Sequence, residues 1–88
     1  MDDRTLIVEA YLPREQALPR RIARRIEDRL TRYVAPLKAG GLILVLPDAA
    51  PRSIIAEVEV PPRVLILTLS ELTDRVANGT LLDDPHLA

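Results

Sequence analysis

The sequence predicts a single small α+β domain with the element order β-α-β-β-β-α, and three observations lead to this prediction. The chain has 88 residues, the length of one domain. Several short runs are aliphatic or alternate between apolar and polar residues, which is typical of strands. One further stretch repeats its apolar residues at helical spacing. We expect a mixed sheet of about four strands, with one long amphipathic helix on one face and a short C-terminal helix.

The first two elements are predicted to be a strand and the long helix. Residues 5–12 alternate between two faces and predict a strand. In residues 22–37 apolar side chains recur every three or four positions, which places them in one stripe of a helix. Pro19 suits the first turn of this helix. Pro36 is expected to close it, because the residue before a proline disfavours helical geometry.

Three more strands and a short helix are expected after the long helix. Residues 42–46 are all aliphatic and predict a strand that is buried on both faces. Residues 53–60 alternate again, and residues 64–69 are almost entirely apolar. The strands on either side of the long helix should be parallel, and the later strands antiparallel. A short helix is expected over residues 71–78, with Ser70 as its N-cap.

The chain is predicted to form one domain over residues 1–80, followed by a flexible tail over residues 81–88. It has no Cys, which excludes disulfides, thiol chemistry and cysteine-based metal sites. Its only His, His86, lies in this tail. Glu57 and Glu59 would share one face of a strand, but no nucleophile or second type of metal ligand accompanies them in the sequence. The sequence therefore predicts no catalytic residue, no metal site and no cofactor.

Charge is unevenly distributed along the chain, although the net charge is only −1. Residues 14–32 hold seven arginines against three acids, whereas residues 39–88 hold three arginines against seven acids. Four arginines of the long helix should lie close together on its surface: Arg21, Arg25, Arg29 and Arg32. This surface is a candidate for binding an acidic protein or the phosphates of a nucleic acid. Alternatively it is a solvated face whose charges pair with Glu27 and Asp28.

A second candidate surface is the face of the sheet opposite the long helix. The second and fourth predicted strands are apolar on both faces, so the long helix covers only half of their apolar surface. The residues assigned to this far face include Ile7, Ile55, Leu65 and Leu67. A large open apolar face is unusual in a monomer. We expect a second copy of the chain or another protein to cover it, or alternatively the C-terminal helix and the leucines of the tail.

The sequence therefore predicts a non-enzymatic protein-interaction or assembly module. It would form a homodimer or dock on a different protein through the apolar sheet face, with the arginine-rich helix as a second surface. The alternative is a nucleic-acid-associated accessory protein that uses residues 20–32. The acidic composition and the low aromatic content disfavour this alternative. No apolar run approaches the ~18 residues of a membrane span, and no basic signal-peptide region is present, so we expect no membrane association and a cytoplasmic protein.

Overall fold

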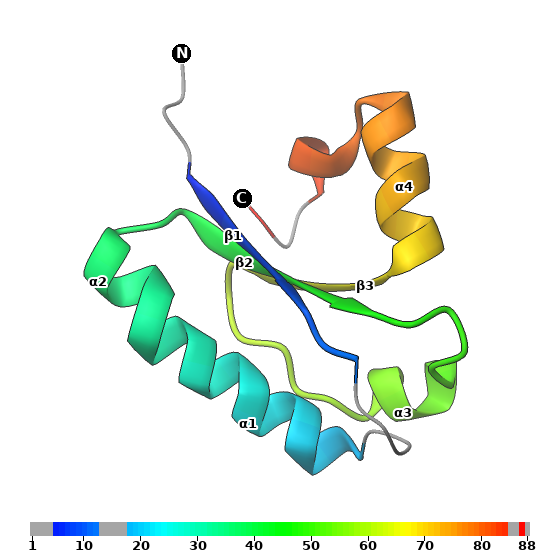
Figure 1. Ribbon diagram of the computed structural model, residues 1–88, viewed down its shortest axis with the longest axis horizontal. Coiled ribbons are helices and arrows are strands. Elements are labelled where there is room, and N and C mark those ends of the chain that lie inside the picture. Colours follow the sequence, from blue (N-terminus) through cyan, green and yellow to red (C-terminus); the bar gives the residue numbers. More distant parts are fainter. Residues whose placement is uncertain (1–4, 13–17, 85–86, 88) are drawn as a thin grey trace.

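The described residues form a three-stranded parallel sheet with helices on both faces (Figure 1). The computed structural model describes residues 5–12, 18–84 and 87. The strands, in chain order and also in sheet order, are β1 (Leu6–Ala10), β2 (Gly41–Leu46) and β3 (Val64–Thr68). In this part of the chain β2 is therefore the central strand, and β1 and β3 are the two edges of the sheet.

The prediction of a mixed four-stranded sheet is wrong, because the third predicted strand, residues 53–60, is not a strand. Its first half belongs to a helix, α3 (Arg52–Ala56), and no regular element follows before β3. The apolar residues of this segment fit both the alternation of a strand and the spacing of a short helix. Ile54, Ile55 and Val58 lie close enough in sequence to share one side of a helical turn, and all three belong to the core on one face of the sheet. Burial of that side, rather than alternation with a period of two, determined the conformation.

The loss of that strand also changes the direction of β3, which was expected to be antiparallel. β3 runs parallel to β2, with Leu42 opposite Val64 and Leu46 opposite Thr68. Parallel neighbours need a long crossover rather than a hairpin, and residues 47–63 provide it. The parallel pairing of the first two strands is confirmed.

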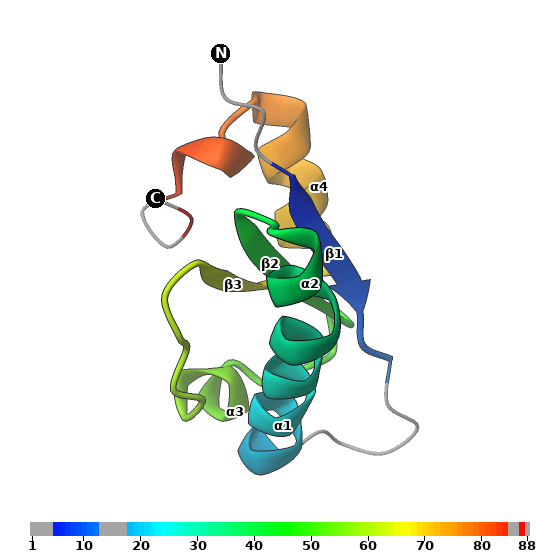
Figure 2. The ribbon, with the colours of Figure 1, turned by 90° about the vertical axis from the view of Figure 1, so that its left-hand side faces the viewer.

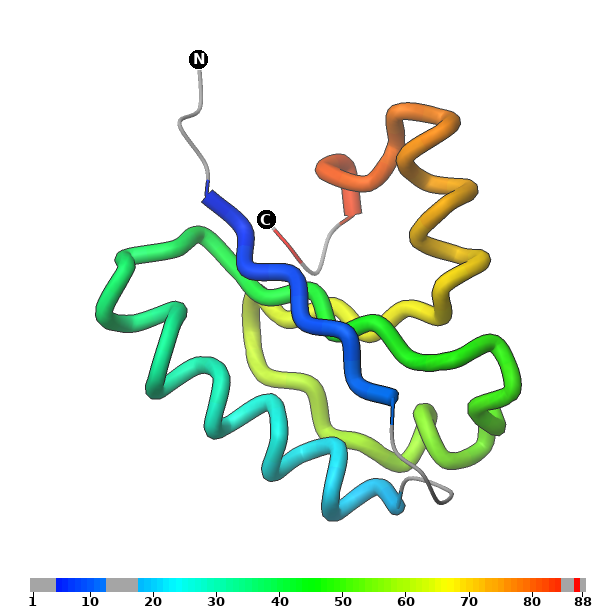
Figure 3. Tube along the Cα trace, viewed as in Figure 1, coloured from blue at the N-terminus to red at the C-terminus, as the bar shows by residue number. Residues whose placement is uncertain are grey.

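The long amphipathic helix is confirmed. α1 (Pro19–Arg29) passes into a π-helical turn, η1 (Leu30–Val34), and then into α2 (Ala35–Leu37). Figure 3 shows the Cα trace of these three elements as one continuous helical path. Ile22 and Ile26 are both 1% exposed and face the sheet, as the apolar stripe predicted.

Pro36 was expected to end this helix, and that expectation is wrong. The helix runs through Pro36 to Leu37, and the capping residue Lys38 adopts a left-handed φ of 53°. The turn directly before the proline is π-helical, and the N–H of Ala35 donates to the carbonyl of Leu30, five residues back. The wider turn leaves room for the proline ring, which in a regular helix clashes with the carbonyl of the preceding turn.

One face of the sheet is covered by α1 and by the crossover that contains α3. Leu42, Leu44 and Leu46 of β2 pack there against Ile22 and Ile26 of α1. Both crossovers lie on this face. This is expected, because two right-handed connections that add strands in the same direction fall on the same side of a sheet.

The opposite face is covered by the C-terminal part of the chain. α4 (Leu69–Asn78) and a 3-10 turn, η2 (Leu81–Asp83), lie on this side, and Figure 2 shows them across the sheet from α1 and α3. The buried residues of this second core are Ile43, Val45, Leu65, Leu67 and Leu87. β2 is therefore buried on both faces, as its aliphatic sequence predicted.

The described part of residues 81–88 packs on the domain. Leu87 is 1% exposed and belongs to the second core. Arg75 of α4 forms an ion pair with Asp84, which ties the end of the chain to α4. His86 lies outside the described residues, and a domain boundary at residue 80 stays a prediction.

Candidate interaction site on the arginine face of helix α1

A shallow depression on the outer side of α1 gathers most of the arginines of this helix. Ile22 and Ile26 hold one side of α1 against the sheet, so the arginines between and around them point to solvent or toward β1. The depression has a volume of about 650 Å³. We call it the arginine groove, and its lining residues are Tyr11, Arg21, Arg24, Arg25, Asp28, Arg29 and Arg32.

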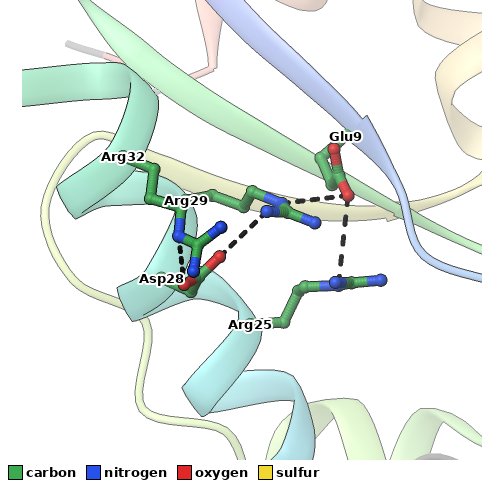
Figure 4. Close-up of polar contacts among 5 residues, drawn as sticks. All are labelled: Glu9, Arg25, Asp28, Arg29 and Arg32. Carbon is green, nitrogen blue, oxygen red and sulfur yellow. Dashed lines mark hydrogen bonds and ion pairs between the residues drawn. The ribbon is translucent and has the colours of Figure 1, made fainter. Parts of the chain in front are cut away.

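Glu9 connects the arginine groove to the edge of the sheet. Its side chain extends from β1 toward α1, where its Oε1 lies 3.0 Å from Nε of Arg29 and 3.9 Å from Nε of Arg25 (Figure 4). The side chains of Glu9 and Arg29 are 23% and 15% exposed. Water and salt screen a partly buried pair less than an exposed one. Glu9 therefore forms ion pairs with two arginines, which neutralise the only charge on β1, although the buried Nε atoms of both arginines lack a hydrogen-bond partner among the described residues.

Two tyrosines contact the guanidinium planes of the same arginines. The central guanidinium carbon of Arg25 lies 4.8 Å from the centre of the Tyr11 ring, and that of Arg29 lies 5.5 Å from the centre of the Tyr33 ring. Cation–π contacts of this kind contribute ~0.5–1 kcal/mol at exposed sites. Tyr11 follows β1 directly, so the end of the strand supplies one wall of the groove.

The positive charge of the groove is only partly neutralised. Asp28 pairs with Arg29 at 2.9 Å and with Arg32 at 3.0 Å. Within the described part of the chain, neither Arg21 nor Arg24 forms an ion pair. Five arginines thus face two carboxylates, which leaves an excess of three positive charges on the groove.

The structure brings together all four arginines that were predicted to form one surface, but they are not equivalent. Arg29 is largely buried between Glu9 and the helix, whereas the side chain of Arg32 is 67% exposed. Arg21 is also exposed, and Arg25 is intermediate. The exposed members are accessible from solvent, whereas Arg29 is paired with Glu9 and Asp28.

Three members of the site were not predicted: Glu9, Tyr11 and Arg24. Glu9 and Tyr11 belong to a segment that is distant in sequence from α1, and they meet it only because β1 and α1 pack together. The alternation of residues 5–12 already placed both on one side of a strand. That shared side was the signal that could have linked them to the helix.

The four apolar residues assigned to a far sheet face do not form one surface. Leu65 and Leu67 are 6% and 2% exposed, and the chain itself covers them with the elements on the α4 side. Ile7 and Ile55 pack on the other core, on the α1 side of the sheet. Ile7 pairs with Leu42, and directly paired residues of parallel strands point to the same face. The C-terminal elements of the same chain therefore cover Leu65 and Leu67, which was the alternative prediction for this face.

Glu57 and Glu59 do not share a strand face, because they lie in the irregular segment after α3, where both are exposed. Within residues 5–12, 18–84 and 87, no three His, Cys, Asp or Glu side chains are grouped so that they could hold a metal ion. None of the described helices combines the length and hydrophobicity that a membrane span requires.

The N-terminus of α4 is occupied by carboxylates of the protein itself. Asp48 accepts hydrogen bonds from the backbone N–H of Ser70, at 2.8 Å, and from its hydroxyl. The hydroxyl and the backbone N–H of Ser70 lower the pKa of the Asp48 carboxyl, because both bonds favour its charged form. Thr68, rather than the predicted Ser70, is the N-cap and forms a capping box with Glu71. No ligand site is assigned to this helix end.

No protein-family model, curated protein or solved structure matches this chain.

Proposed function

We propose that this chain is a non-enzymatic interaction module that docks an acidic surface of a partner protein in the arginine groove. The observation that supports this proposal is the excess of positive charge in one depression, where Arg21 and Arg24 form no ion pair with described residues. The planar guanidinium offers five N–H donors in a fork that matches a carboxylate. Arg25 already pairs with Glu9, which restricts its side chain, so binding through Arg25 costs less side-chain entropy.

An acidic protein segment fits the surroundings of the groove better than a nucleic acid does. Residues 39–88 hold seven acids against three arginines, so a long polyanion that reaches beyond the groove is repelled, whereas a short acidic segment that stays within the groove is not. Tyr11 is the only aromatic residue that lines the groove in the described structure, whereas proteins that bind single strands stack successive bases on several rings. A nucleic acid bound by the same arginines is the alternative function.

The proposal is tested with a short fluorescent peptide of glutamates, whose binding at low salt is followed by anisotropy. We expect binding that weakens as salt is added. The double variant Arg21→Glu/Arg24→Glu should weaken it by about tenfold or more, equivalent to about 1.4 kcal/mol. These two positions are chosen because neither makes an ion pair with a described residue, so reversing them leaves the contacts of Glu9 intact.

Arg20→Glu is the matched control, since Arg20 is exposed on the same helix but does not line the groove. This variant should bind the peptide nearly as well as the unmodified chain. No binding at low salt, or equal losses in the control and the double variant, would contradict the proposal. A labelled single-stranded oligonucleotide measured in parallel tests the alternative. Tight oligonucleotide binding with a steep salt dependence, without peptide binding, would favour a nucleic acid.

A further inference from the structure

The outer side of β1 is an open sheet edge. Gly40 donates to the carbonyl of Thr5, and Tyr11 donates to the carbonyl of Val45, so the odd-numbered residues of β1 direct their backbone groups toward β2. The alternation of a strand then turns the N–H and C=O of Leu6, Val8 and Ala10 away from the sheet. In the described structure no strand pairs with that side. Figure 2 shows β1 as the outermost strand on this side of the sheet, with α1 and α4 set back from it.

This edge lacks several of the devices that usually prevent strands from pairing between molecules. Residues 5–12 contain no proline and no lysine, and β1 pairs with β2 without a bulge. Its one charge, Glu9, is neutralised by arginines of the same chain. Apolar side chains are exposed along it, with Val8 at 56% and Leu12 at 69%.

We propose that β1 pairs with the β1 strand of a second copy of this chain, antiparallel and about a two-fold axis at Val8. This register is the only one that pairs all five residues of β1. It places Val8 opposite the partner's Val8, Leu6 opposite the partner's Ala10, and Ile7 opposite the partner's Glu9. A register centred on Glu9 instead pairs fewer residues and sets two carboxylates directly opposite, which is destabilising.

The pairing would join the two sheets into one sheet of six strands, three from each copy. A two-fold axis perpendicular to the sheet keeps both α1 helices on the same face. The two arginine grooves would then lie on one side of the dimer and could engage one acidic partner together. Five paired residues per copy make a small interface, so we expect a dimer that dissociates on dilution. The pairing itself does not depend on what the groove binds.

The first test is the solution mass measured by light scattering over a dilution series. We expect a monomer–dimer equilibrium for the unmodified chain. Val8→Lys should weaken dimerisation by about tenfold or more, because it sets two positive charges opposite each other at the axis. Val8→Pro should also weaken it, because it removes the outward N–H. That N–H makes no bond to β2, so the sheet of each copy stays intact.

Val76→Lys is the matched control, since Val76 is 62% exposed on α4, away from β1, and should leave the dimer unchanged. A chain that is monomeric at every concentration, or a dimer that tolerates both Val8 variants, would overturn the proposal. Circular dichroism of each variant shows whether it folds.

The register is tested in a way that does not depend on a destabilising change. The chain has no cysteine, so Val8→Cys introduces a single thiol. At the axis of an antiparallel pair the two Cα atoms are about 5.5 Å apart, within the range that a disulfide spans. Mild oxidation should link Val8→Cys into a covalent dimer, whereas Val76→Cys should stay mostly monomeric. Equal linking of the two variants, or none in Val8→Cys, contradicts this register.

Discussion

The two edge strands of the sheet differ in how far the rest of the chain covers their outer side. On β3 the turn before the strand and the helix after it close the two ends of that side. The N–H of Val64 donates to the carbonyl of Pro61 at 3.3 Å, and the N–H of Thr68 donates to the carboxylate of Glu71 at 3.2 Å. Every residue of β3 except Ile66 is buried. The two ends of this edge are therefore closed by its own chain, while Ile66 in the middle is half-buried.

β1 has no comparable protection in the part of the chain that the structure describes. Val8 and Ala10 are exposed, and the other residues of the strand are only half-buried. β1 is held by its ladder to β2 and by the pair between Glu9 and Arg29. The difference predicts that β3 contributes more to the stability of the fold, whereas β1 and the arginine groove are the surfaces for which we propose interactions.

The largest effect is expected from truncating a buried side chain of β3. Leu67 is 2% exposed, and Leu67→Ala should lower the free energy of unfolding by about 2–5 kcal/mol, because it leaves a cavity in the second core. Val8→Ala on the open edge should lower it by less than about 1 kcal/mol. Urea denaturation of dilute protein measures both values. Equal losses would show that the two edges contribute alike to stability.

A smaller loss is expected when the closure of β3 is weakened at its end. Thr68→Ala removes the hydroxyl that caps α4 and accepts a hydrogen bond from the N–H of Glu71, at 3.3 Å. Loss of a threonine cap lowers the free energy of unfolding by about 1 kcal/mol. Thr73→Ala is the control, since its hydroxyl donates to the carbonyl of Leu69 inside the exposed part of α4. Alanine favours helix there, so this variant should not be less stable in thermal denaturation.

In the arginine groove we expect a buried arginine to contribute more to the free energy of unfolding than an exposed one. Arg29→Ala removes the pair with Glu9 and the contact with Tyr33, and we expect a loss of about 1 kcal/mol in urea denaturation. Arg21→Ala should change the free energy of unfolding by less than about 0.5 kcal/mol, because exposed charges contribute little. If Arg21→Ala were as destabilising as Arg29→Ala, the expected difference between the buried and the exposed arginine would be incorrect.

The smallest effect concerns the hydrogen bonds of Asp48 beside the C-terminal end of β3. The pKa of its carboxyl is below the ordinary value, chiefly because the Ser70 hydroxyl donates to it. Folding is therefore favoured slightly above the pKa of the unfolded chain, and this contribution is lost as the pH falls through the lower pKa of the folded chain.

Ser70→Ala should raise the pKa of Asp48 toward its ordinary value, which a carboxyl titration followed by NMR measures. Ser53→Ala, at an exposed serine of α3, should leave it unchanged. An Asp48 pKa that does not respond to Ser70→Ala would show that the bond is not formed in solution.

Those elements with one unambiguous pattern were predictable from the sequence. The stripe that contains Ile22 and Ile26 defined α1, and the all-aliphatic residues 42–46 defined the buried central strand. Residues 53–60 were not predictable, since their apolar residues satisfy a strand and a short helix equally well. The surrounding core, which depends on contacts far apart in sequence, selected the helix.

The part of the candidate site that lies on the helix was predictable from the sequence, and the part contributed by β1 and Tyr11 was not. The spacing of four arginines along α1 placed them on one surface, because helix geometry is local. The contribution of Glu9 and Tyr11 depends on which side of β1 faces α1 and on how far the strand extends along the helix. Both follow from the packing of the strand against the helix, which the sequence pattern does not specify.

Amide hydrogen exchange of Val8 and Thr68, measured at several protein concentrations, tests the difference between the two edges most directly. The N–H of Thr68 should be protected equally at every concentration, because Glu71 of the same chain accepts its hydrogen bond. The N–H of Val8 should exchange fast in dilute protein and more slowly as the concentration rises and β1 pairs with a second copy. Strong protection of Val8 in dilute protein, or exchange that does not change with concentration, would contradict an open β1 edge that pairs between molecules.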